Sequence, residues 1–237
     1  MKSFGIVYLS FGLNYVDCTI AALQSKIKNA PLTPATVLTN RKQDMGSTLC
    51  KQGGIQLQYI DINEVDTREI KTQVHKYSPY EYTLLLDCDA WINAELSIYF
   101  GMLDYAPLLL THAHHHPAIA TAGHVGIPDR QYTMNSVHGQ GFLPQYSSGV
   151  MFFRRDDERV RQLFDIWHTE WLRFHNKDQM ALFRAIIQTQ LFPLVLSDKY
   201  WLTDRQGKGF ISHSFGTALP SMPRKDARSP RKHQRIP

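Results

Sequence analysis

Apolar residues in the first ninety positions form short runs separated by amphipathic stretches. Three of these runs have the length and the β-branched or aromatic composition of buried strands: residues 4–10, 35–39 and 55–60. The stretches between them predict helices over 15–28 and 43–51, and a third helix is predicted over 66–77. A fourth apolar run, Tyr82–Leu86, follows. Such alternation is typical of a mostly parallel sheet flanked by helices, so the expected fold class is α/β.

The same pattern continues in the second half of the chain. Residues 148–154 predict a strand, and 156–173 predict a helix with an apolar and aromatic stripe at helical spacing. We expect that stripe to face the core; its members are Val160, Leu163, Phe164, Trp167 and Trp171. A helix over 177–190, a strand near 193–196 and an apolar segment at 210–215 complete the pattern.

Residues 112–146 interrupt the pattern after an apolar stretch at Pro107–Thr111. The segment is polar and longer than an ordinary connection in a compact domain, so we interpret it as a functional loop. Five of its histidines cluster in the first half of the segment: His112, His114, His115, His116 and His124. Adjacent histidines in an extended segment point in different directions, and no nearby cysteine or carboxylate completes a tetrahedral set, which disfavours zinc binding. The loop is expected to cover the sheet or a substrate.

Length and charge divide the chain into a domain and a tail. The 237 residues, 43% of them hydrophobic, suit one α/β domain, which we place at 1–222. Residues 223–237 contain six Lys or Arg and one Asp, whereas 1–222 contain 20 residues of each sign, so the tail carries the whole net charge of +5. This composition predicts disorder. The tail either aids solubility or attracts a nucleic acid or anionic surface.

Other features of the sequence predict a soluble, cytoplasmic protein. No apolar run approaches the roughly 20 residues that a membrane helix needs, and the N-terminal apolar stretch lacks a small-residue cleavage site. The three cysteines, Cys18, Cys50 and Cys88, form no CxxC pair and are expected to be reduced.

The strongest chemical signal is Asp87-Cys88-Asp89, directly after the apolar strand at 82–86. The carboxyl ends of strands in open α/β sheets are where ligands bind. Two carboxylates one residue apart can turn towards one hard cation, Mn²⁺ or Mg²⁺, which prefers oxygen ligands. Unpaired charge beside an apolar strand is costly, which favours a metal site over a solvated or helix-capping pair.

Five segments together resemble the retaining GT-A glycosyltransferases related to glycogenin and bacterial lipopolysaccharide galactosyltransferases. In chain order they are IVYLSFGLNY, YTLLLDCDAWI, YSSGVMFFRR, KDQMAL and ISHSFG, and the resemblance covers about residues 4 to 216. It implies a single GT-A domain that transfers a sugar from a nucleoside diphosphate donor, a UDP-sugar, with retention. A bound metal would stabilise the charge that develops on the leaving diphosphate.

The resemblance also implies roles for individual residues. His213 would be the third metal ligand beside Asp87 and Asp89, and Asp178 and Gln179 would lie near the anomeric carbon as the catalytic pair. The expected donor-binding positions are Ser10, Asn14, Tyr15, Lys71, Asp87, Cys88 and Asp89. Tyr15 would stack on the base, and Lys71 would favour the diphosphate.

Each of these assignments has a structural alternative. His213 could be a surface or core histidine, and Tyr15 could pack the first helix on the sheet. Lys71 could be a solvated helix residue, and Asp178 could cap the helix that it begins.

Two departures from the family pattern concern the donor and acceptor contacts. Leu219-Pro220 replaces a Lys-Pro that helps to neutralise the diphosphate in the family, and Ser147-Ser148-Gly149 lacks the leading asparagine of the family's triplet. Both changes alter side chains that the family places against its ligands.

Two other function classes are compatible with the same sheet and metal. A nucleotidyltransferase would normally have a basic, glycine-rich segment after the first strand, and SFGLNY contains no Lys or Arg. A non-catalytic nucleotide-sugar-binding protein is the other alternative. For an enzyme, the acceptor is open among a saccharide, a lipid-linked sugar, a protein and a modified nucleic acid. A saccharide is the main expectation, and the basic tail favours nucleic acid modestly.

Overall fold

The structure, a computed structural model, describes residues 2–62, 67–113, 118–196, 202–203 and 209–213. Within them, the main element is a seven-stranded sheet with the order β3-β2-β1-β4-β7-β6-β8. Its strands are β1 (Phe4–Ser10), β2 (Ala35–Thr39), β3 (Ile55–Tyr59), β4 (Tyr82–Leu86), β6 (Leu108–His112), β7 (Tyr146–Arg154) and β8 (Leu194–Leu196). Only β7 pairs antiparallel with its neighbours among these strands, so the predicted mostly parallel α/β sheet is confirmed.

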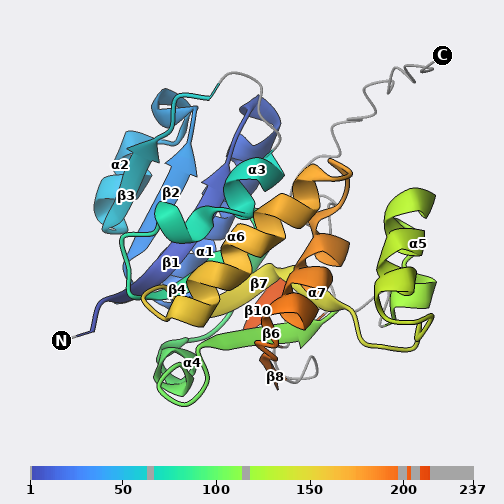
Figure 1. The fold of residues 1–237 in the computed structure, drawn as a ribbon. Coiled ribbons are helices and arrows are strands. Elements are labelled where there is room, and N and C mark those ends of the chain that lie inside the picture. Colours follow the sequence, from blue (N-terminus) through green and yellow to red (C-terminus); the bar gives the residue numbers. More distant parts are fainter. Residues whose placement is uncertain (1, 63–66, 114–117, 197–201, 204–208, 214–237) are drawn as a thin grey trace.

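Helices cover both faces of this sheet, as Figure 1 shows. They are α1 (Val16–Asn29), α2 (Ser47–Gln52), α3 (Thr67–Lys71), α4 (Ser97–Met102), α5 (Ile127–Ser136), α6 (Glu158–Leu172) and α7 (Asp178–Thr189). No helix in the described ranges combines the length and apolar character needed to cross a membrane.

The core consists of two clusters separated by the sheet. Alternate residues of each strand point to opposite faces, so Val7 joins the cluster under α6 and α7, whereas Tyr8 joins the cluster under α1 and α4. The predicted aromatic stripe of α6 is confirmed as core, with Trp167 fully buried. The fold is therefore a three-layer α/β/α arrangement built around one sheet.

A small second sheet lies beside α1. It contains β5 (Ala90–Ile92), β9 (Leu202–Thr203) and β10 (Ile211–His213), with β10 antiparallel to β5 and parallel to β9. The sequence pattern missed β5, β9 and α4 because each is too short to show a periodicity of its own.

Two predicted helices are shorter than expected. The helix predicted over 43–51 is a 3-10 turn at Lys42–Asp44 followed by α2, because Gly46 between them has a positive φ of 68° that no helix accommodates. The helix predicted over 66–77 is α3 followed by a 3-10 turn at Val74–Lys76.

The interpretation of residues 112–146 as a loop is wrong in one respect, because the segment contains the ten-residue helix α5. The buried side of α5 includes Asp129 and Thr133, so it shows no apolar repeat. Arg184 of α7 makes this polar side stable: its Nη1 lies 2.6 Å from Asp129 Oδ1 and donates to Thr133 Oγ1, and its Nε donates to Glu170 of α6. A polar helix face with a buried ionic partner gives no hydrophobic signal in the sequence.

Candidate metal and nucleotide site

Asp87, Asp89 and His213 come together at the carboxyl edge of the main sheet. One ligand atom from each of the three lies within 4.8 Å of the others. His213 Nε2 is 3.0 Å from Asp89 Oδ1 and 3.9 Å from Asp87 Oδ2. Two carboxylates and an imidazole fit a divalent ion such as Mn²⁺, which accepts both oxygen and nitrogen ligands.

Backbone pairing brings these residues together from distant parts of the sequence. The chain turns directly after β4, with the Ala90 N–H donating to the Asp87 carbonyl at 3.0 Å, and this turn carries both aspartates. His213 then pairs with Ala90 across the small sheet. The expected third ligand is therefore placed by strand register beside the first two.

Gly149 of β7 supplies the space for this arrangement. The Asp87 N–H donates to the Gly149 carbonyl at 2.9 Å, which holds the end of β4 against β7. A Cβ on Gly149 would clash with His213 Cε1 and would lie 2.7 Å from Asp87 Oδ2. The glycine in the Ser147-Ser148-Gly149 triplet is thus explained by the close approach of two candidate ligands.

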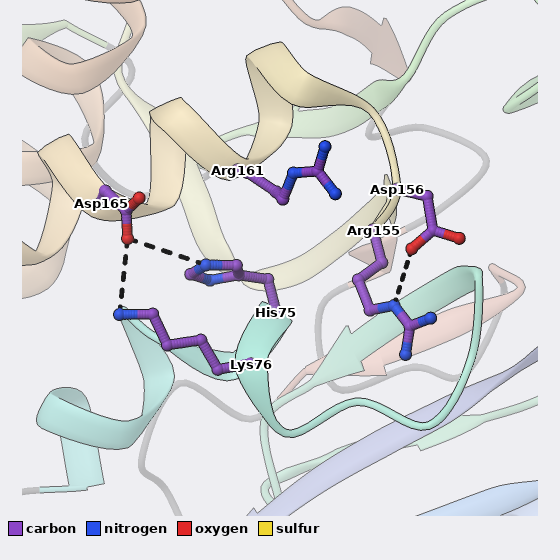
Figure 2. Close-up of a pocket in the computed structure, with 6 residues that line it drawn as sticks. All are labelled: His75, Lys76, Arg155, Asp156, Arg161 and Asp165. Carbon is purple, nitrogen blue, oxygen red and sulfur yellow. Dashed lines mark hydrogen bonds and ion pairs between the residues drawn. The ribbon is translucent and has the colours of Figure 1, made fainter.

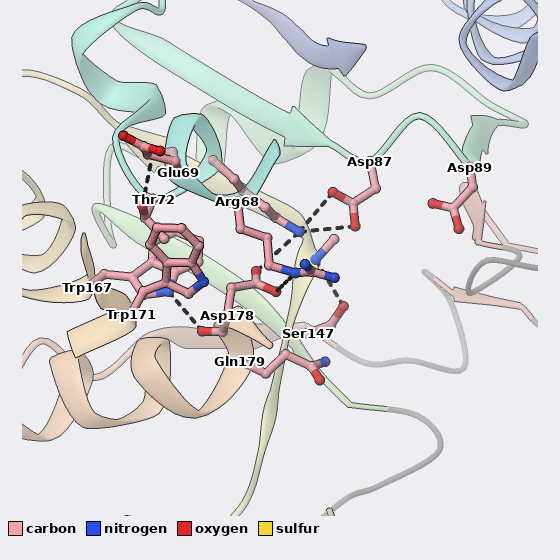
Figure 3. A network of polar contacts seen from close by, with 12 residues as sticks. Arg68, Glu69, Thr72, Asp87, Asp89, Ser147, Trp167, Trp171, Asp178 and Gln179 are labelled. Atoms are coloured by element: carbon pink, nitrogen blue, oxygen red, sulfur yellow. Dashed lines mark hydrogen bonds and ion pairs between the residues drawn. The ribbon is translucent and has the colours of Figure 1, made fainter. Parts of the chain in front are cut away.

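Lys71, at the end of α3, joins the three candidate metal ligands to α7. Its Nζ lies 2.8 Å from Asp87 Oδ1 and 3.3 Å from Asp178 Oδ2, and Figure 3 shows the two carboxylates facing the same space. The Lys71 side chain is buried, so the alternative of a solvated helix residue is wrong. Burial alone would lower the pKa of Lys71, but Asp178 and Asp87 outweigh it and raise that pKa above its ordinary value.

Asp178 is the first residue of α7 and makes ion pairs there. Burial would raise the pKa of Asp178, but Lys71, the Ser148 hydroxyl and Arg68 together hold it below its usual range. Arg68 Nε lies 3.8 Å from Asp178 Oδ1. The helix has Lys177 as its N-cap residue, without a side-chain cap, so the capping alternative for Asp178 is not what the structure shows.

Two tryptophans of α6 anchor the start of α7 through their ring nitrogens. Trp167 Nε1 donates to the Asp178 carbonyl at 2.9 Å (Figure 3), and Trp171 Nε1 donates to the Asn176 carbonyl at 3.1 Å. The core stripe therefore also fixes the backbone that carries Asp178 and Gln179.

Gln179 is held by two residues that sequence analysis did not assign. Its Oε1 lies 2.6 Å from His124 Nε2 and accepts from Gln145 Nε2 at 3.0 Å. Both partners belong to the segment between β6 and β7. No local pattern in the sequence identifies them as contacts of Gln179. His124 was noted only as one of the clustered histidines in the predicted functional loop.

The predicted nucleotide-binding residues at the end of β1 lie at the same edge of the sheet. Tyr8 pairs with Leu86 in the parallel register, so the residues after each strand are neighbours. Asn14 and Tyr15 are exposed there. Ser10 is fully buried, and the Thr19 hydroxyl donates to its Oγ at 2.9 Å.

Cys88 lies between the two aspartates but is buried. Burial and the neighbouring carboxylates raise the pKa of its thiol above the ordinary value. The side chains of Cys88 and Ser10 are therefore both buried at this edge.

A hollow with a volume of about 480 Å³ lies at the other end of β4 (Figure 2). Its lining residues are His75, Lys76, Arg155, Asp156, Arg161 and Asp165. Ion pairs link Arg155 to Asp156 and Lys76 to Asp165. Arg155 also donates to Ser78 just before β4, and five strand residues separate this end from Asp87 by roughly 16 Å. The hollow is separate from the candidate site.

Solved glycosyltransferase structures share this fold. The apo structure of the bifunctional glycosyltransferase WbbM matches with a TM-score of 0.66 and 12% identity, over 92% of this chain and 47% of WbbM. Apo mouse xyloside xylosyltransferase 1 matches with a TM-score of 0.64 and 12% identity, over 92% of this chain and 99% of that one. The galactosyltransferase LgtC, in complex with donor and acceptor sugar analogues, matches with a TM-score of 0.63 and 14% identity, over 91% and 88%.

Sequence comparison adds nothing to this likeness, since neither a protein-family model nor a curated protein matches the chain. The chain spans less than half the length of WbbM, but nearly the full length of the xylosyltransferase. At 12% to 14% identity the likeness establishes the fold. The chain therefore has the GT-A fold of these glycosyltransferases, as its ordered motifs had led us to expect.

Proposed function

We propose that this protein is a metal-dependent glycosyltransferase that moves a sugar from a UDP-sugar to a saccharide acceptor with retention of configuration. The observation that carries the proposal is the meeting of Asp87, Asp89 and His213 at the carboxyl edge of a GT-A sheet, next to the Lys71–Asp178 ion pair. The uridine base and retention rest on the sequence resemblance. A sugar donor and a sugar acceptor are the ligand types present in the LgtC complex.

The charges of the site favour cooperative binding of metal and nucleotide. Asp87, Asp89 and Asp178 bring three carboxylates together, and Lys71 and Arg68 bring two cations. This formal balance is negative and repels a diphosphate. A divalent ion makes the balance positive, so metal and nucleoside diphosphate should bind cooperatively.

Each group then has a defined task in the proposed reaction. Asp87, Asp89 and His213 would hold Mn²⁺ or Mg²⁺, which supplies Lewis acidity to the leaving diphosphate. Asp178, kept ionised by Lys71, accepts hydrogen bonds from donor-sugar hydroxyls. Tyr15, whose side chain is exposed at the same edge, would stack on the base.

Calorimetry with UDP tests the proposal. UDP should bind in the presence of Mn²⁺, and binding should be lost with chelator or in Asp89→Ala. Asp156→Ala removes a carboxylate at the remote hollow and should leave UDP binding unchanged. Equal UDP affinity in Asp89→Ala, and in wild type with chelator, would show that the metal assignment is wrong.

Hydrolysis of UDP-sugars separates this function from its alternatives. A non-catalytic binding protein would bind UDP with Mn²⁺ but release no UDP from a UDP-sugar. A nucleotidyltransferase would join UTP to a sugar phosphate and release pyrophosphate. The residues that follow β1, at Leu13–Tyr15, contain no cation to bind a triphosphate, which disfavours this alternative. The basic tail lies outside the described residues, and a nucleic acid acceptor stays a hypothesis from sequence.

A further inference from the structure

The carboxamide of Gln179 has a fixed direction in the structure. Its Oε1 lies 2.6 Å from His124 Nε2 and 3.0 Å from Gln145 Nε2. Gln145 Nε2 can only donate, so the oxygen of Gln179 is the acceptor in this group. His124 must then carry its proton on Nε2 to form the second hydrogen bond.

Both hydrogen-bond partners of Gln179 belong to segments of the chain other than α7. Gln145 directly precedes β7, is fully buried, and has a backbone carbonyl that accepts from the Ala113 N–H at 2.8 Å. His124 lies between the 3-10 turn at Ile119–Thr121 and α5, and α5 is tied to α7 through Arg184. Gln145 is thus fixed next to β7, and His124 lies directly before a helix that is ion-paired to α7.

The two contacts decide which part of the carboxamide can meet a ligand. An amide oxygen has two lone pairs, and here both have a donor. In the described part of the chain, the Nε2 of Gln179 donates to no other residue, and Gln179 is half-buried. The group that remains for a ligand is thus the amide N–H, a hydrogen-bond donor.

We infer that His124 and Gln145 are positioning residues that hold the Gln179 oxygen away from the reacting sugar and present the Gln179 N–H to the donor. This inference rests on the proposed function. In this arrangement Gln179 stabilises an oxygen of the donor by hydrogen bonding, and its own oxygen is too occupied to attack the anomeric carbon. His124 and Gln145 thereby act on the reaction through Gln179.

The proton on His124 can be observed without any substrate. In ¹⁵N-labelled protein at pH 8, two-bond ¹H–¹⁵N correlation spectra distinguish the Nε2–H from the Nδ1–H tautomer, and His124→Phe assigns the His124 signals. We expect the Nε2–H form. An Nδ1–H form would mean that His124 accepts from Gln179, which would reverse the carboxamide and overturn the inference.

Hydrolysis kinetics test the consequence for catalysis. UDP-glucose, UDP-galactose and UDP-xylose are supplied with Mn²⁺, and the donor that wild type hydrolyses is used for the variants. His124→Phe keeps an aromatic ring but removes the N–H that donates a hydrogen bond to Gln179. This variant should lower kcat roughly tenfold or more with little change in KM. His124→Gln places an amide N–H near the position of Nε2 and should restore most of that loss.

Two controls keep the outcomes distinct. UDP affinity with Mn²⁺ should be the same in all variants, because the three candidate metal ligands do not include His124. Equal kcat in His124→Phe and wild type, equal losses in His124→Phe and His124→Gln, or a parallel loss of UDP affinity would each overturn the inference. Failure of wild type to bind UDP with Mn²⁺ would instead refute the proposed function, and the tautomer measurement would still decide the hydrogen-bond arrangement.

Discussion

Gly149 approaches His213 so closely that no side chain fits between them, and the same hypothetical Cβ would lie 2.7 Å from Asp87 Oδ2. Gly149→Ala should therefore displace two of the three candidate metal ligands. We expect at least tenfold weaker binding of Mn²⁺ with UDP, measured by calorimetry. Gly101→Ala in α4, where a Cβ meets nothing within 4 Å, is the matched control. Unchanged affinity in Gly149→Ala would argue against a metal held at this point.

Removal of the Lys71 charge should destabilise the fold. Lys71→Met leaves the buried Asp178 without its nearest cation, and breaking a buried pair from one side costs about 3 to 5 kcal/mol. Urea denaturation at pH 7 measures the change. Adding Asp178→Asn to Lys71→Met removes the isolated charge and should recover part of the loss. If the double variant is less stable than Lys71→Met, Asp178 is stabilised by groups other than Lys71.

His75 should make the protein less stable in mild acid. Its side chain is buried and stacks on Phe164, and burial lowers its pKa to about 4. The unfolded chain, with an ordinary histidine pKa of about 6.5, binds a proton that the folded protein excludes between these two values. Stability is therefore full above pH 6.5 and falls as the pH decreases towards 4.

The size of this effect can be isolated by substitution. Between pH 7 and pH 4.5 the His75 contribution amounts to roughly 2 kcal/mol. His75→Phe keeps an aromatic ring against Phe164 and removes the titration, so its unfolding free energy should decrease less over this range. Identical pH dependence of wild type and His75→Phe in urea titrations would show that His75 is not protonated on unfolding.

Arg184 should contribute more to stability than a surface arginine that contacts the same partner. Arg184 is buried between Asp129 and Glu170, whereas Arg173 is exposed and lies 3.1 Å from Glu170 Oε1. Arg184→Met should cost about 3 to 5 kcal/mol, and Arg173→Met less than about 1 kcal/mol. Hydrogen exchange should also become faster in α5. Similar losses in the two variants would mean that the buried ion pairs do not fasten α5.

The sequence predicted those parts of the fold whose signal is local. The buried strands at 35–39 and 82–86 have their predicted bounds, because an apolar run that ends at a turn is visible without its neighbours. Asp87 and Asp89 were likewise visible from their place after such a strand. The resemblance added His213, and the structure brings it to the two aspartates.

The parts that escaped prediction depend on contacts between distant residues. The buried polar side of α5 is explained by its ion pair with Arg184, which lies 55 residues further along the chain. Gln145 could not be assigned to the site without its hydrogen bond to Gln179. The predicted roles of Tyr15 and of the 223–237 tail, and the cytoplasmic location, stay predictions.

Strand β7 and the residue before it contact several residues of the candidate site: Gln179, Asp178, Asp87 and His213. Gln145 holds Gln179, Ser148 bonds to Asp178, and Gly149 makes room for His213. A slip of one residue in the pairing of β7 would turn each of these to the opposite face of the sheet. These contacts therefore all depend on one strand register, and under the proposed function UDP binding would report the fraction of molecules in which β7 is paired in that register.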